Sequence, residues 1–340
     1  MAPDLVTIGG LTVDNVISAD GRVALAQAGG NGAYSAVGAL VWTDRVGLVS
    51  TAVESYPRAT LAQLEAGGVD LSGVAFWPGR LTACSWFIYD AAGDRDEGLT
   101  SPPDALAEAG FPTDRLTPNQ VACWRTLLSQ RPTGEIGYSE FRDRHPLVPA
   151  QVPQAWLGAR GVHLAPSQPS VMRAMLDLFG PDVTVTADPG WQLAARSLDE
   201  IAPLLARLDA FLPSEVELRA LVPGAGLADG LAELSRRSPG AVAVKLGPRG
   251  ALVWDRPSAA AVEVSARTVE AVDPTGAGDA FSGGFLAGHV ETGDPVSAAR
   301  FGALSASRIV SAFGADAALP VDRGAARTEL AQEESAHPLL

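Results

Sequence analysis

The segment from Thr275 to Asp279 (TGAGD) combines residue types that could act on an anion. Glycine lets the backbone turn tightly and approach a ligand closely. The segment precedes a helical pattern that contains Phe281 and Phe285, and the first amides of a helix point outward without partners. Such amides stabilise the negative charge of a phosphoryl group during its transfer. Asp279, at the head of this helix, is placed to take a proton from an attacking hydroxyl.

Other interpretations of this segment are weaker. A simple helix cap needs one Asp, Ser, Thr or Asn, but not two glycines and an alanine immediately before it. A dinucleotide-binding fingerprint does not fit, because Phe281 stands at the place of its third glycine and the motif comes far too late in the chain. A P-loop would require Gly-Lys-Ser/Thr, which is absent here. The pattern therefore favours a phosphoryl-transfer site over an NAD-dependent oxidoreductase.

Apolar or β-branched runs alternate with helical patterns along most of the chain. We expect buried strands at 4–10, 46–49, 84–89, 162–164, 183–186, 208–212 and 241–246. Helical patterns occupy 30–43, 57–66, 170–179 and 294–314. This alternation is typical of an α/β fold with a mainly parallel sheet that helices cover on both faces.

Composition excludes several other classes of protein. The 340 residues are 47% hydrophobic and 19% charged, which indicates a folded globular chain. A net charge of −14 argues against binding to nucleic acid or to an anionic membrane. No apolar run is long enough to span a bilayer and no secretory signal is visible, so we expect a cytoplasmic protein. Cys84 and Cys123 give neither a disulfide framework nor a metal-ligand spacing, and we expect both to be small buried residues.

The longer stretch 273–284 (DPTGAGDAFSGG) closely resembles the C-terminal signature of the ribokinase-like sugar kinases, also called the PfkB family. The resemblance implies a ribokinase-like three-layer α/β fold, with a mainly parallel central sheet flanked by helices and a small β-sheet lid. It implies one kinase domain over 1–320, with the lid formed from about 11–28 and 74–98. Residues 321–340 are polar, and we expect a C-terminal tail that frays. A lid that closes would exclude water from the site.

The same resemblance implies ATP-dependent phosphorylation of a hydroxyl on a sugar or sugar-like substrate. It assigns Asp279 as the general base and the amides of Gly276, Ala277 and Gly278 as the anion hole. It also implies that Asp273 and Thr275 help to hold a monovalent cation such as K⁺.

A second motif, Ser214-Glu215-Val216-Glu217, resembles the family's Asn-x-x-Glu element. Glu217 then helps to organise Mg²⁺, usually through water, since this ion needs only one or two carboxylates. Ser214 replaces the family's asparagine. Asp188-Pro189-Gly190 resembles an Asp-Pro-Asn stretch whose asparagine is lost.

Candidate substrate ligands lie near the N-terminus. Asp14 follows the first expected strand and could accept two hydroxyl hydrogen bonds; it would also fit a turn, but the resemblance implies a sugar ligand. Gly29, Gly30 and Asn31 resemble the family's N-terminal glycine pair at the start of a helix. Tyr34 departs from the family, which usually has a substrate-contacting asparagine there, so the pocket should differ in volume and hydrogen bonding.

Further along the chain, Glu140, Arg142 and Asp143 fit a solvated charged turn better than a substrate contact. No cluster of Arg and Lys is visible at the substrate end, which disfavours a phosphorylated sugar. At the nucleotide end, Lys245 stands where the family often has threonine, and could touch a phosphate or point to solvent.

The remaining nucleotide candidates are glycines. Gly247 and Gly250 resemble the turn under the nucleotide, although a hairpin without a ligand would look the same. Gly314 resembles the family's adenine-side loop.

Two alternatives stay open: a nucleoside kinase of the same fold, and a catalytically weak member that binds ligands or regulates. Tyr34, Gly190 and Ser214 motivate the second of these, and the retained Asp279 argues against it. The expected partners are ATP and a small-molecule substrate, with no nucleic acid and no membrane. The aromatic strand at 84–89 suggests a homodimer through the lid strands.

Overall fold

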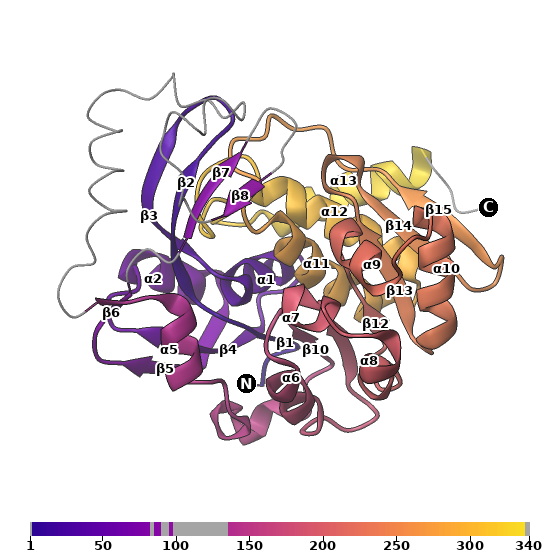
Figure 1. Cartoon of the computed structure of the whole chain (residues 1–340). Coiled ribbons are helices and arrows are strands. Elements are labelled where there is room, and N and C mark those ends of the chain that lie inside the picture. The colour runs from indigo at the N-terminus through magenta and orange to yellow at the C-terminus, as the bar shows by residue number, and fades with distance from the viewer. Residues whose placement is uncertain (1, 82–84, 90–94, 98–134, 337–340) are drawn as a thin grey trace.

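The structure, a computed structural model, describes residues 2–81, 85–89, 95–97 and 135–336 (Figure 1). The strands of its large sheet are β1 (Leu5–Ile8), β4 (Val46–Val53), β5 (Val69–Trp77), β10 (Gly161–Leu164), β11 (Thr184–Ala187), β12 (Ala210–Phe211), β13 (Ala241–Lys245), β14 (Ala251–Asp255) and β15 (Ala260–Val264). They form a nine-stranded sheet in the order β15-β14-β13-β12-β11-β10-β1-β4-β5. Strands from β13 to β5 pair in parallel, and β14 and β15 add an antiparallel edge.

Helices cover both faces of this sheet (Figure 1). One face packs against α1 (Asn31–Leu40), α2 (Arg58–Gly67), α11 (Ala277–Thr292), α12 (Pro295–Ile309) and α13 (Arg323–Ala336). The other face packs against α6 (Pro169–Leu176), α7 (Gly190–Ala194), α8 (Leu198–Leu205), α9 (Glu215–Leu221) and α10 (Leu227–Arg237). Because side chains alternate along a strand, Leu5 of β1 enters the first core, whereas Val6 and Ile8 enter the second.

A separate sheet of four strands lies beside the large one, toward the α1 side (Figure 1). It has the order β3-β2-β7-β8 and consists of β2 (Thr12–Ile17), β3 (Val23–Gly29), β7 (Ser85–Tyr89) and β8 (Arg95–Glu97). Residues 74–77, which the predicted lid includes, instead end β5 of the large sheet. The short strands β6 (Arg80–Leu81) and β9 (Glu135–Ile136) pair with each other, and α5 (Tyr138–Arg144) follows. The layers confirm the predicted three-layer α/β architecture with a small additional sheet.

The C-terminal segment differs from the expected frayed tail, because residues 323–336 form α13. Asp322 Oδ1 accepts a hydrogen bond from the Ala325 amide at 2.9 Å and caps the first turn. Ala326 and Leu330, one helical turn apart, are 0% and 5% exposed in the core with α1 and α12. A narrow apolar stripe is therefore enough to fix an otherwise polar helix.

Some sequence-based expectations fall outside this description. Cys84 and Cys123 do not belong to the described residues, and neither do residues 98–134. Within the described part of the chain, no helix has both the length and the apolar character that crossing a membrane requires.

Glycines let α11 approach its two neighbouring helices until backbones touch. A Cβ atom on Gly38 of α1 would lie 2.1 Å from the carbonyl oxygen of Ala280, and one on Gly283 would lie 2.0 Å from that of Ser35. On the α12 side, a Cβ atom on Gly284 would lie 2.3 Å from Ser305 Oγ. These contacts fix α11 between α1 and α12, and so fix where its N-terminus lies.

Candidate active site

The N-terminus of α11 presents backbone donors. Gly276, the residue before the helix, has a φ of 75°, a left-handed conformation that favours glycine. The Ala277 amide donates to the carbonyl of Pro274 at 3.1 Å, so this member of the predicted anion hole has a partner within the loop. The amides of Gly276 and Gly278 make no hydrogen bond to any other described residue. These two donors, at the positive end of a 16-residue helix, are the ones available to an anion.

Two predicted cation ligands shape this loop from inside. Asp273 is 1% exposed, and its Oδ1 accepts a hydrogen bond from the Thr275 amide at 2.9 Å. Thr275 Oγ1 lies 2.9 Å from the hydroxyl of Tyr89 on β7. The small sheet is thereby connected directly to the anion loop, a link that local sequence patterns do not indicate.

Tyr34 lies beneath the loop. Its side chain is 2% exposed, and a Cβ atom on Gly276 would lie 2.1 Å from Tyr34 Cγ. Burial, together with the charges of Asp273 and Asp14, raises the pKa of Tyr34 well above its usual value. The hydroxyl therefore stays protonated. Tyr34 shapes the anion loop, and its predicted contact with substrate stays a prediction.

Asp14 lies on β2 and is 3% exposed. Its Oδ2 accepts a hydrogen bond from Thr12 Oγ1 at 3.2 Å. A Cβ atom on Gly29 would lie 1.9 Å from the same Oδ2, so Gly29 is the residue type that leaves room for this carboxylate. The structure brings Asp14 and Gly29 together as the predicted substrate end requires.

Asn31 connects two strand ends. Its Oδ1 accepts a hydrogen bond from the Gly10 amide at 2.6 Å, and its Nδ2 donates to the carbonyl of Pro166 at 2.8 Å. Gly30, with a φ of 103°, turns the chain into α1, and any side chain there would collide with the Gly10 carbonyl. Both groups of the carboxamide are thus engaged in holding the segments after β1 and β10 together, beside the predicted substrate end.

Lys245, at the end of β13, points into the site and not to solvent. Its side chain is 11% exposed and forms an ion pair with Asp188, which is 4% exposed. A Cβ atom on Gly278 would lie 3.6 Å from Lys245 Nζ, so the ammonium group lies against the anion loop. Burial lowers the pKa of Lys245, but Asp188, Glu217 and Asp279 together outweigh it and raise that pKa. The site therefore holds a cation beside the two available amides.

Asp188, the partner of Lys245, belongs to the Asp188-Pro189-Gly190 stretch of the sequence analysis. Burial, opposed by the charge of Lys245 and aided by the charges of Glu217 and Asp279, raises the pKa of Asp188 to about 7. The charges of three carboxylates, Asp188, Glu217 and Asp279, thus act on one ammonium group.

One of the two carboxylate oxygens of Glu217 takes part in a helix cap. Its Oε2 accepts hydrogen bonds from the Ser214 amide at 2.6 Å and the Ser214 hydroxyl at 2.8 Å, and this reciprocal cap begins α9. The described residues contain no group of three His, Cys, Asp or Glu that could hold a metal by themselves. A magnesium ion shared with nucleotide phosphates needs fewer protein ligands, and Glu217 with its second oxygen fits that arrangement.

The three candidate nucleotide glycines differ from one another. Gly247 has a φ of 59° and no atom within 4 Å of a Cβ position, so it borders open space. A Cβ atom on Gly250 would lie 2.0 Å from the carbonyl of Val264. The pairing of β14 with β15 is therefore sufficient to require glycine at this position. Gly314 has a φ of 89° and precedes Ala315, whose amide donates to Ala28 of β3 at 2.8 Å. Gly314 therefore lies beside the small sheet.

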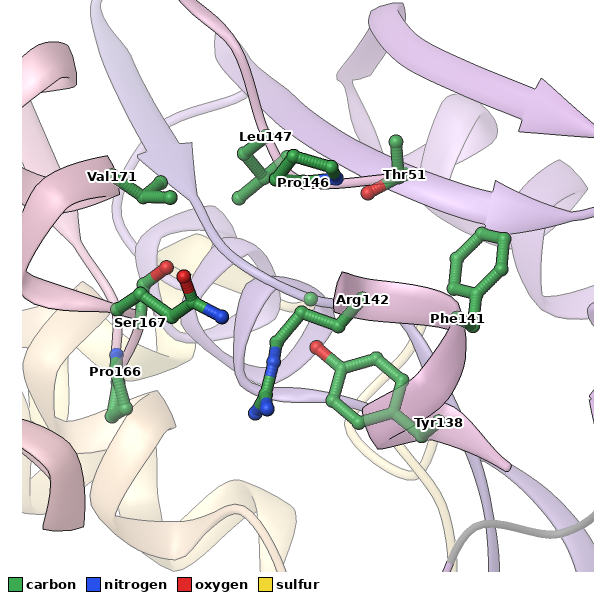
Figure 2. Close-up of a pocket in the computed structure, with 11 residues that line it drawn as sticks. Thr51, Tyr138, Phe141, Arg142, Pro146, Leu147, Pro166, Ser167 and Val171 are labelled. Atoms are coloured by element: carbon green, nitrogen blue, oxygen red, sulfur yellow. The ribbon is translucent and has the colours of Figure 1, made fainter. Parts of the chain in front are cut away.

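Sequence reasoning missed the pocket that α5 forms next to Gly10 (Figure 2). Arg142, expected in a solvated turn, lines this pocket with a side chain that is 28% exposed, whereas Asp143 beside it is 58% exposed. The hydroxyl of Tyr138 lies over Gly10, where a Cβ atom would approach it to 1.9 Å. Only the tertiary structure brings α5 to the end of β1, so no local signal indicated these residues.

A base candidate, two amide donors and a cation meet at the end of a mainly parallel sheet, which suits phosphoryl transfer. The profile of the pfkB family carbohydrate kinases matches residues 154–322. A cytidine kinase from Thermococcus kodakarensis is 28% identical over 288 residues, covering 84% of this chain and 88% of that protein. An ATP-dependent ribose-1-phosphate kinase from Halopiger xanaduensis is 30% identical over 315 residues, covering 88% of each.

A solved structure also shares this fold. An E. coli protein crystallised with ATP and Mg²⁺ superposes with a TM-score of 0.66 at 19% identity, over 98% of this chain and 100% of that chain. This chain belongs to the pfkB family of carbohydrate kinases. It is a phosphotransferase that acts on a hydroxyl group.

Proposed function

We propose that this protein transfers the terminal phosphoryl group of ATP to a hydroxyl of a sugar or nucleoside, with Asp279 as the general base. The observation that carries this proposal is the meeting of Asp279, the available amides of Gly276 and Gly278, and Lys245 at one helix N-terminus. An acceptor held at Asp14 would present its hydroxyl from the side of the small sheet.

Each group has a distinct part in the reaction. Asp279 accepts the proton of the attacking hydroxyl. The amides of Gly276 and Gly278, with Lys245, stabilise the negative charge on the phosphoryl oxygens. Little covalent chemistry is asked of the protein, so holding acceptor and phosphate in line supplies most of the rate.

Two ions complete the proposal. Glu217 would hold Mg²⁺ through water, and the ion would neutralise charge on the ATP phosphates. Asp273 and Thr275 would support K⁺ beside the loop through oxygen atoms. Rates in KCl and in tetramethylammonium chloride at equal ionic strength test the second ion, and equal rates would remove it from the proposal.

The names of two relatives indicate which acceptors to consider. One named relative acts on cytidine and another on ribose 1-phosphate, which share a ribose and differ in the group on its first carbon. Both acceptors are consistent with Asp14 as a ligand of ribose hydroxyls.

ADP release over a panel of sugars, sugar phosphates and nucleosides tests the function. We expect turnover with at least one acceptor, and a loss of at least about a hundredfold in Asp279→Asn. Asp199→Asn, on an exposed position of α8, is the matched control and should behave as the parent. Nucleotide binding without any turnover would favour a ligand-binding or regulatory protein, and full activity in Asp279→Asn would remove this residue as the base.

We also propose that the protein is a homodimer through its small sheet. The strands β3 and β8 are the edges of that sheet, and unpaired edges favour pairing with another chain. Light scattering should give about twice the chain mass of 35.1 kDa, and a mass equal to one chain would refute the dimer.

A further inference from the structure

A buried hydrogen bond joins the small sheet to the anion loop. The hydroxyl of Tyr89, the last residue of β7, lies 2.9 Å from Thr275 Oγ1, although the two residues are 186 positions apart in the sequence. Tyr89 is 3% exposed and Thr275 is 4% exposed, so the bond is shielded from water. Within the described part of the chain, Thr275 Oγ1 makes no other hydrogen bond. The side chain of Thr275 is therefore held by a residue of the small sheet.

Thr275 controls the direction of the first available amide of the loop. The N–H of Gly276 belongs to the peptide plane that begins at the Thr275 carbonyl. Because this plane is rigid, the direction of the N–H follows from the backbone conformation at Thr275. Two bonds hold that conformation, since the Thr275 amide donates to Asp273 Oδ1 at 2.9 Å and the hydroxyl bonds to Tyr89. Without Tyr89, Thr275 would keep only the bond to Asp273 in its own loop.

The strand that carries Tyr89 is paired with the strand that carries the proposed acceptor ligand. In the small sheet, β7 lies between β2 and β8 (Figure 1). It pairs in parallel with β2, from Asp14 opposite Ser85 to Ile17 opposite Ile88. Asp14 and Tyr89 therefore belong to neighbouring strands that one ladder of backbone hydrogen bonds holds together. A movement of this sheet would shift both residues at once.

Two other contacts of the small sheet reach the loop after α12. The Ala315 amide donates to the Ala28 carbonyl at 2.8 Å. The guanidinium carbon of Arg22 lies 5.9 Å from the centre of the Phe313 ring. Neither contact touches residues 273–279, whereas Tyr89 contacts them directly. The position of the sheet can thus act on the anion loop through Tyr89.

We propose that Tyr89 is a positioning residue for phosphoryl transfer, which holds Thr275 so that the Gly276 amide faces the transferred group. The inference rests on the proposed function, because it needs the anion loop to stabilise the phosphoryl group. It adds that the sheet which would hold the acceptor through Asp14 also sets the direction of an amide of the loop. Because Tyr89 acts through Thr275 and not on a ligand, its loss should lower kcat and leave KM nearly unchanged.

Tyr89→Phe tests this bond, because it removes only the hydroxyl group. At a fixed KCl concentration, and with an acceptor that the parent phosphorylates, we expect kcat to fall about three- to tenfold, since a neutral hydrogen bond is lost. The KM values for ATP and for the acceptor should stay within about twofold of the parent values. Thr328→Val, whose exposed hydroxyl bonds to Gly324 within α13, is the control and should keep the parent kcat.

Variants of Thr275 test whether Tyr89 acts through this residue. Thr275→Val should lower kcat at least as much as Tyr89→Phe does. Adding Tyr89→Phe to Thr275→Val should then change kcat by less than about twofold, because the bond is already absent. Thr275→Ser keeps a hydroxyl group, so it should retain most of the parent kcat, and Tyr89→Phe should still lower kcat in that background.

Hydrogen exchange of backbone amides reports on the loop without any substrate. The amides of Thr275 and Ala277 are hydrogen-bonded within the loop, at 2.9 Å and 3.1 Å. In Tyr89→Phe, a peptide that covers residues 273–280 should exchange faster than in the parent, because the loop opens more often. In Thr328→Val, the same peptide should exchange at the parent rate.

The outcomes separate this inference from the proposed function. A parent-like kcat in Tyr89→Phe would overturn the inference, whatever the effect of this variant on unfolding in urea. A change confined to the acceptor KM would place Tyr89 in the acceptor site, and multiplicative effects of Tyr89→Phe and Thr275→Val would show that they act separately; both results would also overturn it. Absence of ADP release from the parent with every acceptor would refute the proposed function instead. The exchange rates would then still decide whether Tyr89 holds the loop.

Discussion

The contact between Gly276 and Tyr34 gives the sharpest test of how the anion loop is built. In Gly276→Ala, the new Cβ atom would lie 2.1 Å from Tyr34 Cγ and 2.3 Å from the two neighbouring ring carbons. Carbon atoms in contact are normally about 3.5–4.0 Å apart, so the loop or the ring must move by more than an ångström. The ring cannot retreat freely, because Tyr34 is 2% exposed on a helix packed tightly against α11.

Gly293, at the other end of α11, provides a matched control. Its φ of 68° resembles the 75° of Gly276, but nothing lies within 4 Å of its Cβ position. Gly293→Ala should therefore lower the free energy of unfolding only by the cost of a left-handed backbone conformation at alanine, about 1–2 kcal/mol. Gly276→Ala should lower the free energy of unfolding by the same amount and by about 1–3 kcal/mol more, because the new Cβ atom overpacks against Tyr34. Urea unfolding of the two variants measures this difference.

Activity should separate the two variants further. A displaced loop misplaces the amides of Gly276 and Gly278, and loss of one such donor typically lowers kcat about 10²- to 10³-fold. Gly293→Ala should keep the parent kcat. In a double-mutant cycle, Tyr34→Ala should destabilise the Gly276→Ala background less than the parent, since it also removes the overlap. Equal stability of the two glycine variants, with kcat of Gly276→Ala near the parent value, would refute the reasoning.

Three further predictions concern the cation, a buried histidine and the C-terminal helix. Lys245→Met should lower kcat roughly ten- to a hundredfold through loss of a charge-assisted hydrogen bond. Arg249→Met, at a side chain that is 59% exposed on the next turn, should keep the parent kcat. Equal rates of ADP release in Lys245→Met and in the parent would exclude Lys245 from the site. Burial, aided by the charge of Lys245, lowers the pKa of His163 from its ordinary value of 6.5 to about 3. Between pH 6.5 and pH 3 the unfolded chain therefore binds a proton at His163 that the folded chain does not bind. Stability should fall by about 2 kcal/mol from pH 7 to pH 5 for this reason, and urea titrations should show that loss reduced in His163→Asn; an unchanged pH dependence would contradict the assignment. Leu330→Ala should lower the free energy of unfolding by about 2–5 kcal/mol while Gln332→Ala, exposed on the same helix, changes it little; no effect of either would mean that α13 is not packed.

Local pattern was sufficient to predict the α/β layers and the helix that begins at the glycine-rich segment. Period-two and period-3.6 patterns report burial directly, and the segment before Asp279 carries its chemistry in consecutive residues. The C-terminal helix was missed although Ala326 and Leu330 stand one helical turn apart, because two apolar residues hardly raise the hydrophobicity of a polar segment.

The roles of Asn31, Arg142 and Lys245 depend on residues far away in the sequence. Asn31 bonds to Pro166, 135 positions later, and Lys245 pairs with Asp188, 57 positions earlier. A motif can show that such a side chain belongs to a site, but its direction follows from which strand ends become neighbours. The same holds for Arg142, because a charged residue in a short turn has the same sequence pattern on a surface and in a pocket wall.

The glycines between α1 and α11 determine how the start of one helix lies relative to the start of the other. The helix α1 begins at the substrate end, with Asn31, and α11 begins at the anion loop. Contacts at Gly38 and Gly283 set the two helices at backbone distance, and Tyr34 of α1 then lies directly under Gly276 of α11. In the proposed reaction, the separation between the acceptor hydroxyl and the phosphoryl group would therefore be set by helix packing well outside the site. Because a displacement of about 1 Å can lower the rate of an aligned reaction about a hundredfold, we expect substitutions at Gly38 and Gly283 to lower kcat although neither glycine lies in the proposed site.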